Sequence, residues 1–262
     1  MTKEAFRLSE ELRTPILLRV TTRMAHSRAV VETADNTPVQ NEMSLPENVQ
    51  HFILLPAFAK KNYAELVAAQ PAFVHKSETS PFNSYVKGTH PERGIITTGI
   101  AYNYLMENYQ PAMGCSILKV AQYPLPVALI NQMVADGAKE ILVIEEGQPV
   151  VEELIHGLVP STVAVKGRLT GDLPRMGELT PDSVRLAIGL DALPTREADN
   201  LVVNRPPALC QGCGHRDVYA ALNEVAREYP QPRIFGDIGC YTLGALSPFH
   251  AIHACVEMGA SI

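Results

Sequence analysis

The sequence predicts an α/β protein built around a doubly wound parallel-sheet domain, and two observations lead to that prediction. Between residues 93 and 166, short apolar runs alternate regularly with longer segments of helical periodicity. Glycines such as Gly99 and Gly137 stand where one pattern gives way to the other. Strands that alternate with helices are typical of a parallel sheet with helices on both faces.

The elements of this central region follow in chain order. The expected strands are "RGIITTGI", "CSILKVAQ", "KEILVIEEG" and "TVAVKG". The expected helices are "AYNYLMENY", "LPVALINQMVADG", ending at Gly137, and "PVVEELIHGL". Ligands of such sheets bind at the carboxyl ends of the strands, where Gly99 and the corner Glu145–Glu146–Gly147 stand. The two glutamates are either an acid–base pair or a solvated corner.

The region before residue 93 is less regular. We expect a helix over "KEAFRLSEELRT", a buried strand over "PILLRVTT" and a polar loop over "TADNTPVQNEMSLPEN". A further helical pattern, "PAFAKKNYAELVAAQPAFV", is expected to break before Pro71, because proline lacks a backbone N–H. After the first strand come Arg23, His26, Ser27 and Arg28. These side chains are consistent with an anion site, a domain interface or a solvated polar loop.

After residue 166 we expect a second linker that carries a short helix, with Thr180 as N-cap and Pro181 as its first residue. From residue 205 the α/β pattern restarts. A cysteine-containing loop leads into the helix "RDVYAALNEVAREY" and the strand "PRIFGDIG", and "HAIHACVEMGASI" begins a helix or turn.

Composition excludes several classes of protein. The 262 residues hold 22 Lys and Arg against 28 Asp and Glu, so the net charge of −6 does not suggest a nucleic-acid surface. No apolar run approaches the roughly 20 residues of a membrane span, and the N-terminus lacks a signal-peptide pattern. Five irregularly spaced cysteines favour reduced thiols and a cytoplasmic location. We read Cys115 and Cys255 as core residues.

The segment "RPPALCQGCGHRDVYAAL" contains the motif with the clearest chemistry, Cys210-Gln-Gly-Cys213. Two thiolates at this spacing can chelate a metal ion or one iron of a cluster. His215 and Cys240 could complete a zinc site, although the histidine spacing is unusual. A thioredoxin-like pair, an iron–sulfur cluster with a ligand elsewhere and unliganded thiols are the alternatives. The spacing alone leaves all four open.

The second motif, "GDIGCYTLG", follows an expected strand and so lies at a sheet edge. Gly236, Gly239 and Gly244 would let the backbone turn sharply and approach a ligand. The motif matches neither the dinucleotide fingerprint nor a P-loop, and a tight crossover explains it equally well.

Together, "RPPALCQGCGHRDVYAAL" and "GDIGCYTLGALSPFHAIHACVEMGASI" resemble the large subunits of indolepyruvate:ferredoxin oxidoreductases. These are a branch of the thiamine-diphosphate-dependent 2-oxoacid:ferredoxin oxidoreductases. The segments "TPILLRVTTRMAHSRAVVE", "RGIITTGIAYNYLMEN", "LVIEEGQPVVEE" and "LPRMGELTP" extend the resemblance, in order, over nearly the whole chain.

The resemblance implies a division of the chain into parts of a longer protein. Residues 1–36 would end a pyrimidine-binding domain, and 93–166 would form a transketolase C-terminal-like domain. Residues 205–262 would begin the diphosphate-binding domain, so that partial cofactor-binding domains flank the central one. Residues 37–92 and 167–204 would be linkers. The motif that holds Mg²⁺ and diphosphate would lie outside this chain, which by itself would be inactive.

The resemblance also implies site residues. Ile238, Gly239, Cys240 and Tyr241 match the family loop against thiamine diphosphate. Met258, Gly259 and Ala260 match a segment beside its thiazolium ring. Cys210, Cys213 and Cys240 match three ligands of a [4Fe-4S] cluster.

The implied reaction is the oxidative decarboxylation of an aryl 2-oxoacid to its acyl-coenzyme A, with electrons passed to ferredoxin. A small β subunit would be the partner, with neither nucleic acid nor membrane involved. The alternative is a non-catalytic metal-binding or assembly module that retains the cysteine loop.

Overall fold

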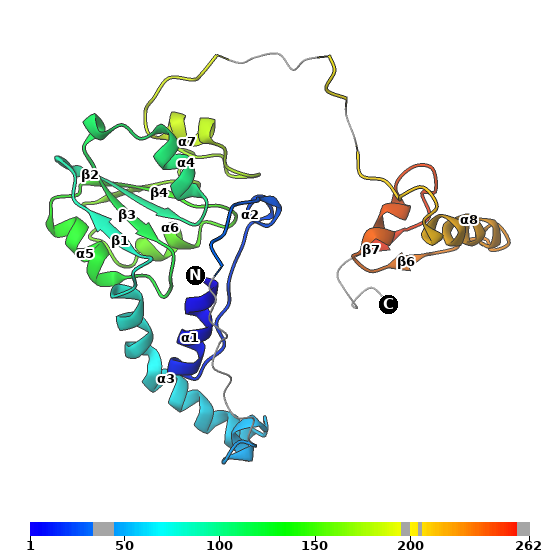
Figure 1. Ribbon diagram of the computed structural model, residues 1–262, viewed down its shortest axis with the longest axis horizontal. Helices are drawn as coiled ribbons and strands as arrows, with labels where there is room; N and C mark the ends of the chain where they lie inside the picture. Colours follow the sequence, from blue (N-terminus) through cyan, green and yellow to red (C-terminus); the bar gives the residue numbers. More distant parts are fainter. Residues whose placement is uncertain (34–44, 195–199, 204–205, 256–262) are drawn as a thin grey trace. The chain divides into compact units, whose positions relative to one another are not determined.

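The computed structural model describes residues 1–33, 45–194, 200–203 and 206–255. The chain divides into two compact units, Met1–Pro194 and Thr195–Ile262. The first unit contains a mixed α/β fold around a five-stranded sheet, and the second contains the cysteine loop (Figure 1). The helices of the first unit are α1 Thr2–Leu12, α2 Thr22–His26, η1 Val49–Phe52, α3 Pro56–Glu78, α4 Ala101–Asn108, η2 Pro111–Met113, α5 Val127–Ala135, α6 Val150–Ile155 and α7 Pro181–Ala187.

The sheet of the first unit is mostly parallel, as predicted. Its strands are β1 Ser84–Val86, β2 His90–Thr98, β3 Cys115–Val120, β4 Glu140–Ile144 and β5 Ala164–Lys166. The order across the sheet is β1-β3-β2-β4-β5; β1 runs antiparallel to β3, and the other pairs are parallel. Strand β1 was not predicted; it is three residues long and lies within residues 37–92, which were expected to be a linker.

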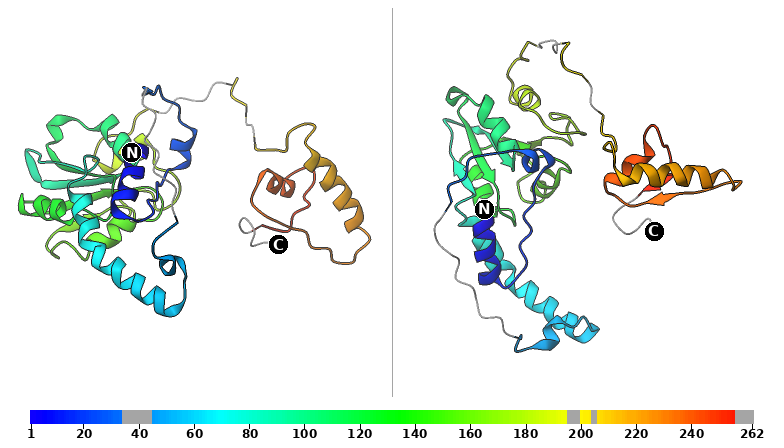
Figure 2. Two further views of the ribbon diagram at one scale, coloured as in Figure 1. Left: turned by 60° about the horizontal axis from the view of Figure 1, so that its bottom comes forward. Right: turned by 45° about the vertical axis from the view of Figure 1, so that its right-hand side comes forward.

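Alternate side chains of the strands belong to two separate hydrophobic cores, one on each face of the sheet. Ile96, Leu118 and Val143 face the core that includes residues of α5 and α6. Ile95, Ile117 and Leu142 face the core that includes residues of α4 and α7. Helices therefore cover both faces, as the strand–helix alternation predicted (Figures 1 and 2).

Residues 167–190, which were expected within a linker, contribute to this core. Leu173, Leu179, Val184 and Ile188 are buried against the face that also packs α4. Thr180 caps α7 as predicted, because its hydroxyl accepts from the Ser183 amide and the Ser183 hydroxyl accepts from the Thr180 amide.

Two predictions for the N-terminal region are wrong. The run "PILLRVTT" forms no strand: Leu17 is 93% exposed, and the segment leads instead into α2, which Thr21 caps. No strand of the described ranges pairs with this run, and a short apolar run does not by itself specify a strand. Helix α3 also continues through Pro71 instead of breaking before it. Pro71 and Val67 are both exposed, so water can reach the carbonyl that the missing amide leaves unbonded.

Helix α3 extends away from the sheet and runs beside α1 (Figures 1 and 2). A mostly apolar cavity of about 360 Å³ lies between these helices and the loop that follows β3. Its charged lining residues are Glu4 and Lys76, and the Lys76 ammonium forms an ion pair with Glu11. No long apolar helix suited to crossing a bilayer occurs among the residues described.

The second unit is small and has its own core. Its elements are α8 Gly214–Ala226, β6 Phe235–Gly236, η3 Cys240–Ala245 and β7 Ala254–Cys255. Strands β6 and β7 pair in parallel. The segment "HAIHAC" therefore leads into a short strand and not into a helix, because it pairs with the chain at the start of the Gly-Asp-Ile-Gly motif. Residues 256–262 lie outside the described part.

Candidate functional site

The cysteine motif forms a tight turn at the start of α8. The Cys213 amide donates to the Cys210 carbonyl at 3.2 Å, and Gly212 adopts a φ of +73°. Glycine suits this left-handed position, and Cys213 then becomes the N-cap of the helix. The sequence Gln-Gly between the cysteines thus places both of them in one turn.

Two side chains of α8 fix the chain on either side of this turn. Arg216 donates to the Leu209 carbonyl at 3.2 Å, directly before Cys210, and its guanidinium lies 5.4 Å from the centre of the Phe249 ring. Tyr219 is buried and donates through its hydroxyl to the Tyr241 carbonyl at 2.7 Å. Both the cysteine loop and the loop from residue 237 to 241 are therefore held by the same helix.

The thiols of the motif are free and reachable. None of the five cysteines forms a disulfide; Cys210 and Cys240 are exposed and Cys213 is partly exposed. Cys213 has a specific neighbour, because its Sγ lies 3.3 Å from Nδ1 of His215. The prediction that Cys115 lies in the core is confirmed, and burial raises the pKa of its thiol. Cys255 is only partly buried.

The Gly-Asp-Ile-Gly-Cys loop is ordered by one hydroxyl. Thr242 Oγ1 accepts from the Gly239 amide at 3.0 Å and donates to the Asp237 carbonyl at 2.8 Å. Ile238, at the tip, is 50% exposed. One carboxylate oxygen of Asp237, Oδ1, is buried and finds no hydrogen-bond partner among the described residues. A buried acceptor without a donor is unusual in a complete site.

The glycines of this loop make room for protein side chains. A Cβ on Gly239 would meet the Tyr241 ring at 2.5 Å, and one on Gly244 would meet the Tyr219 ring at 2.3 Å. At Gly236 the neighbour is Ile252, at 3.2 Å. These three glycines are not among those with positive φ, so their backbone conformation by itself does not require glycine. They permit close packing of aromatic and aliphatic neighbours.

The structure brings together some of the predicted site residues. Cys210 and Cys213 share a turn, while Cys240 and Tyr241 begin η3, which packs against α8 through contacts of Tyr219 and Tyr241. Across the described ranges, no group of three or more His, Cys, Asp or Glu side chains surrounds one possible metal position. Free thiols are suitable ligands for iron or zinc, but the side chains here do not converge on one position. Met258, Gly259 and Ala260 lie outside the described residues.

The corner Glu145–Glu146 at the carboxyl edge of the sheet is not a solvated corner, because Glu145 is buried. Glu145 is only 3% exposed, and its carboxylate accepts from the amides of Val151 at 3.0 Å and Glu152 at 2.9 Å. Burial raises the pKa of Glu145. Glu146 accepts from the Leu179 amide at 2.8 Å. Both carboxylates therefore connect separate backbone segments through hydrogen bonds.

The side chain at the centre of this edge, Arg168, was not predicted from the sequence. It is 2% exposed, and its guanidinium donates to the carbonyls of Pro174, Gly147 and Gly177 at 2.7, 3.1 and 2.7 Å. No motif surrounds Arg168 in the sequence. Of the basic residues considered for an anion site, Arg23 forms an ion pair with Glu178 at 2.8 Å.

No family model matches this chain. Curated relatives do. The chain is 36% identical over 273 residues to "Indolepyruvate oxidoreductase subunit IorA" of Methanothermobacter marburgensis, covering 98% of this chain and 44% of the relative. It is 35% identical to the protein so named in Methanothermobacter thermautotrophicus, over 98% of this chain and 44% of the relative. It is 31% identical to the protein so named in Archaeoglobus fulgidus, over 99% of this chain and 44% of the relative.

The chain is homologous to subunit IorA of indolepyruvate oxidoreductases. The alignments extend over almost all of its length, so the resemblance carried by the cysteine and Gly-Asp-Ile-Gly motifs is confirmed. The chain spans less than half the length of these relatives, which agrees with the expectation that it corresponds to a portion of them.

Proposed function

We propose that this chain is part of a thiamine-diphosphate-dependent oxidoreductase that converts aryl 2-oxoacids to acyl-coenzyme A and passes electrons to ferredoxin. One observation carries the proposal: almost all of this chain aligns with IorA subunits. In addition, the cysteine loop and the loop from residue 237 to 241 are both held by one helix, α8. A small β subunit is the proposed partner, and the cytoplasm is the proposed location.

The chain's three parts are assigned as the resemblance implies. Residues 93–166, which carry most of the five-stranded sheet, correspond to the transketolase C-terminal-like domain. Residues 1–36 and 205–262 correspond to the ends of pyrimidine-binding and diphosphate-binding domains. The separation of residues 195–262 as a compact unit supports the second of these assignments.

In the second unit, Ile238, Gly239, Cys240 and Tyr241 are the residues proposed to contact thiamine diphosphate, with Met258, Gly259 and Ala260. The first three are exposed, so the loop is accessible to a ligand. Asp237 supplies an acceptor that lacks a donor among the described residues. When bound, thiamine diphosphate supplies the electron sink for decarboxylation. The chain orients this cofactor through a loop whose backbone Thr242 and Tyr219 hold in place.

Cys210, Cys213 and Cys240 are the proposed cluster ligands. Their sulfurs are free, and soft thiolates are the ligands that iron–sulfur clusters use. Within the described part of the chain, these donors do not converge on one position.

The test uses the native gene product, purified without oxygen from its source. We expect a mass above the 28.6 kDa of these 262 residues, a co-purifying small subunit, and reduction of ferredoxin that depends on indole-3-pyruvate, coenzyme A and thiamine diphosphate. Cys240→Ala should lower the iron content, whereas Cys255→Ala, outside the proposed ligand set, should leave it unchanged. A product that binds metal without turnover would instead support the assembly-module alternative.

A further inference from the structure

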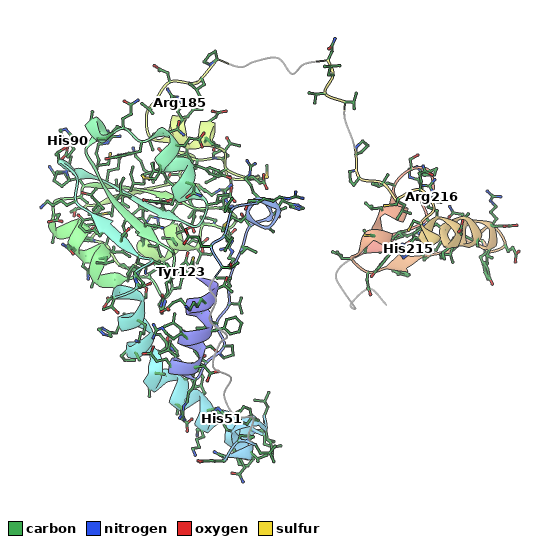
Figure 3. The ribbon with its side chains drawn as sticks, in the orientation of Figure 1. His51, His90, Tyr123, Arg185, His215 and Arg216 are labelled. Atoms are coloured by element: carbon green, nitrogen blue, oxygen red, sulfur yellow. The ribbon has the colours of Figure 1, made fainter. Side chains whose placement is uncertain are left out.

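The cavity of about 360 Å³ in the first unit lies where α1 and α3 meet the sheet, and most of its lining is apolar. Three aromatic side chains from separate segments line it: Phe73 of α3, Phe82 and Tyr123. Figure 3 shows Tyr123 where α1 approaches the sheet. Residues 121–124 of the lining directly follow β3. The cavity therefore lies at the carboxyl end of a parallel strand, where such sheets bind their ligands.

The wall formed by the loop after β3 is held in place by buried polar side chains. The carboxamide oxygen of Asn83 accepts from the amides of Ala121 and Gln122 at 2.7 and 2.9 Å. The Gln122 carbonyl accepts from the Asn83 side chain at 2.9 Å and from the Ser77 hydroxyl at 3.0 Å. Asn83 and Ser77 are at most 7% exposed. This wall is therefore preformed, as small-molecule sites usually are.

Helix α1 and the chain that follows it form another wall. Ala5, Leu8 and Leu12 line the cavity from one face of α1, because they lie three and four residues apart. Leu8 is buried. The chain then returns along the cavity, so that residues 14–18 also line it. Aliphatic side chains on this wall therefore stand with the aromatic ones in a single lining.

The charged groups of the lining are already paired. Glu4 forms an ion pair with Arg7, and Lys76 forms one with Glu11. A charged ligand would lose its water on entering the cavity and would find no free opposite charge among these groups. The lining therefore favours a molecule without charge.

We propose that this cavity binds a small uncharged aromatic molecule. Its volume falls within the range of roughly 300–1,000 Å³ that is usual for small-molecule sites, with room for about three aromatic rings. Aromatic rings of the lining favour an aromatic ligand, since offset and edge-to-face contacts add to the gain from burial. The proposal goes beyond the proposed function and does not rest on it, because the whole lining belongs to the first unit.

The first experiment measures how the native gene product binds phenylnaphthylamine, an uncharged aromatic probe whose fluorescence rises in apolar surroundings. The affinity should exceed that for anilinonaphthalenesulfonate, which has the same rings and a negative charge. Ala5→Phe places a ring in the cavity and should weaken binding of phenylnaphthylamine by about tenfold or more.

Ala68→Phe is the matched control for this variant. It makes the same substitution at an exposed position of α3 that is not part of the lining, so binding should be unchanged. Equal affinity of Ala5→Phe and the parent protein would overturn the proposal, and so would equal weakening in both variants. A preference for the sulfonate probe would overturn the uncharged class of ligand.

The second experiment needs no variant and therefore also decides the matter if Ala5→Phe fails to fold. Methyl resonances of the parent chain are recorded as phenylnaphthylamine is added. The signals of Leu8 and Leu12 should move, because both side chains line the cavity. Those of Leu173 and Leu179, which are buried in the core that includes α4, should stay in place. Stationary signals of Leu8 and Leu12 would contradict the proposal.

Two other occupants of the cavity give distinct results. If a segment of a longer native protein fills it, the 262-residue chain binds the probe and the native product does not. If a second copy of the chain covers it, probe binding falls as the protein concentration rises, and Ala5→Phe sediments more slowly than the parent. Either result would overturn the proposal. Binding by both proteins at an affinity independent of protein concentration would support it.

Discussion

The buried carboxylate of Glu152 accepts a hydrogen bond from the backbone amide of Arg168, with 2.8 Å between Oε2 and N. Both side chains are at most 2% exposed. The same carboxylate accepts from the Leu169 amide, while the Arg168 guanidinium donates to the loops at Gly147 and Gly177. The pair thus connects α6, the chain after β5 and two loops at the carboxyl edge of the sheet.

Glu152→Ala should destabilise the first unit by about 1–3 kcal/mol, because it leaves the amides of Arg168 and Leu169 without this acceptor. Hydrogen exchange of the Ile96 and Leu118 amides would report the free energy of opening of the sheet. The control is Glu153→Ala, an exposed neighbour whose removal should change this free energy by less than about 0.5 kcal/mol. Equal effects of the two variants would contradict the role of Glu152.

Gly167→Ala should be destabilising for a steric reason. A Cβ at this position would lie 2.6 Å from Glu152 Oε2, which is already fixed by two amides. Overpacking of this kind costs about 1–3 kcal/mol. Gly157→Ala, whose Cβ would meet its nearest neighbour at 3.6 Å, is the matched control. Chemical denaturation of both variants, followed by circular dichroism, would show whether the loss of stability comes from the clash at residue 167 or from replacing a glycine in general.

Stability should fall at acidic pH in part through Asp136. Its carboxylate accepts from Lys87 at 2.7 Å and from the Tyr85 hydroxyl at 2.8 Å, and these bonds hold its pKa below the ordinary value of 3.8. A lowered pKa in the folded state contributes stability above the unfolded-state value, and that contribution is lost as the pH falls through the folded-state value.

In the Asp136→Asn variant this contribution should be absent at neutral pH. The stability of the variant should therefore decline less than that of the parent as the pH falls below about 5. Urea unfolding at a series of pH values would measure the difference. Parallel curves for the two proteins would show that the pKa of Asp136 does not differ between the folded and unfolded states as expected.

Tyr219→Phe should loosen the proposed cofactor loop while keeping the aromatic packing against Phe249, whose ring centre lies 6.0 Å away. The variant loses the bond from the hydroxyl to the Tyr241 carbonyl, worth about 0.5–1.5 kcal/mol. Faster hydrogen exchange of the Thr242 and Leu243 amides is the expected result. Tyr229→Phe, at an exposed position, should leave these amides unaffected.

Several parts of the fold could be predicted from the sequence because short-range patterns specify them. The alternation of apolar runs and helical segments indicated β2 to β5 and the helices α4, α5 and α6, which the structure confirms. Thr180 followed by Pro181 predicted the start of α7. Gly137 predicted the end of α5, and it indeed adopts a φ of +116°.

The errors arose where the outcome depends on distant partners. The run from residue 15 to 22 has the composition of a strand, yet none of the described strands lies beside it to complete its hydrogen bonds. Glu145 was expected either in an acid–base pair or in a solvated corner, and it can be buried because the amides at the start of α6 donate hydrogen bonds to it.

The candidate site divides in the same way. The sequence by itself determined the homology to IorA. It also predicted that a loop with Cys210 and Cys213 leads into a helix, because that feature depends on neighbouring residues. Only the tertiary structure decided that Arg168 and Glu152 are buried and that His215 contacts both Cys213 and Tyr241. Burial of a charge and contact across loops depend on groups brought together by packing, and no local pattern in the chain records which groups those are.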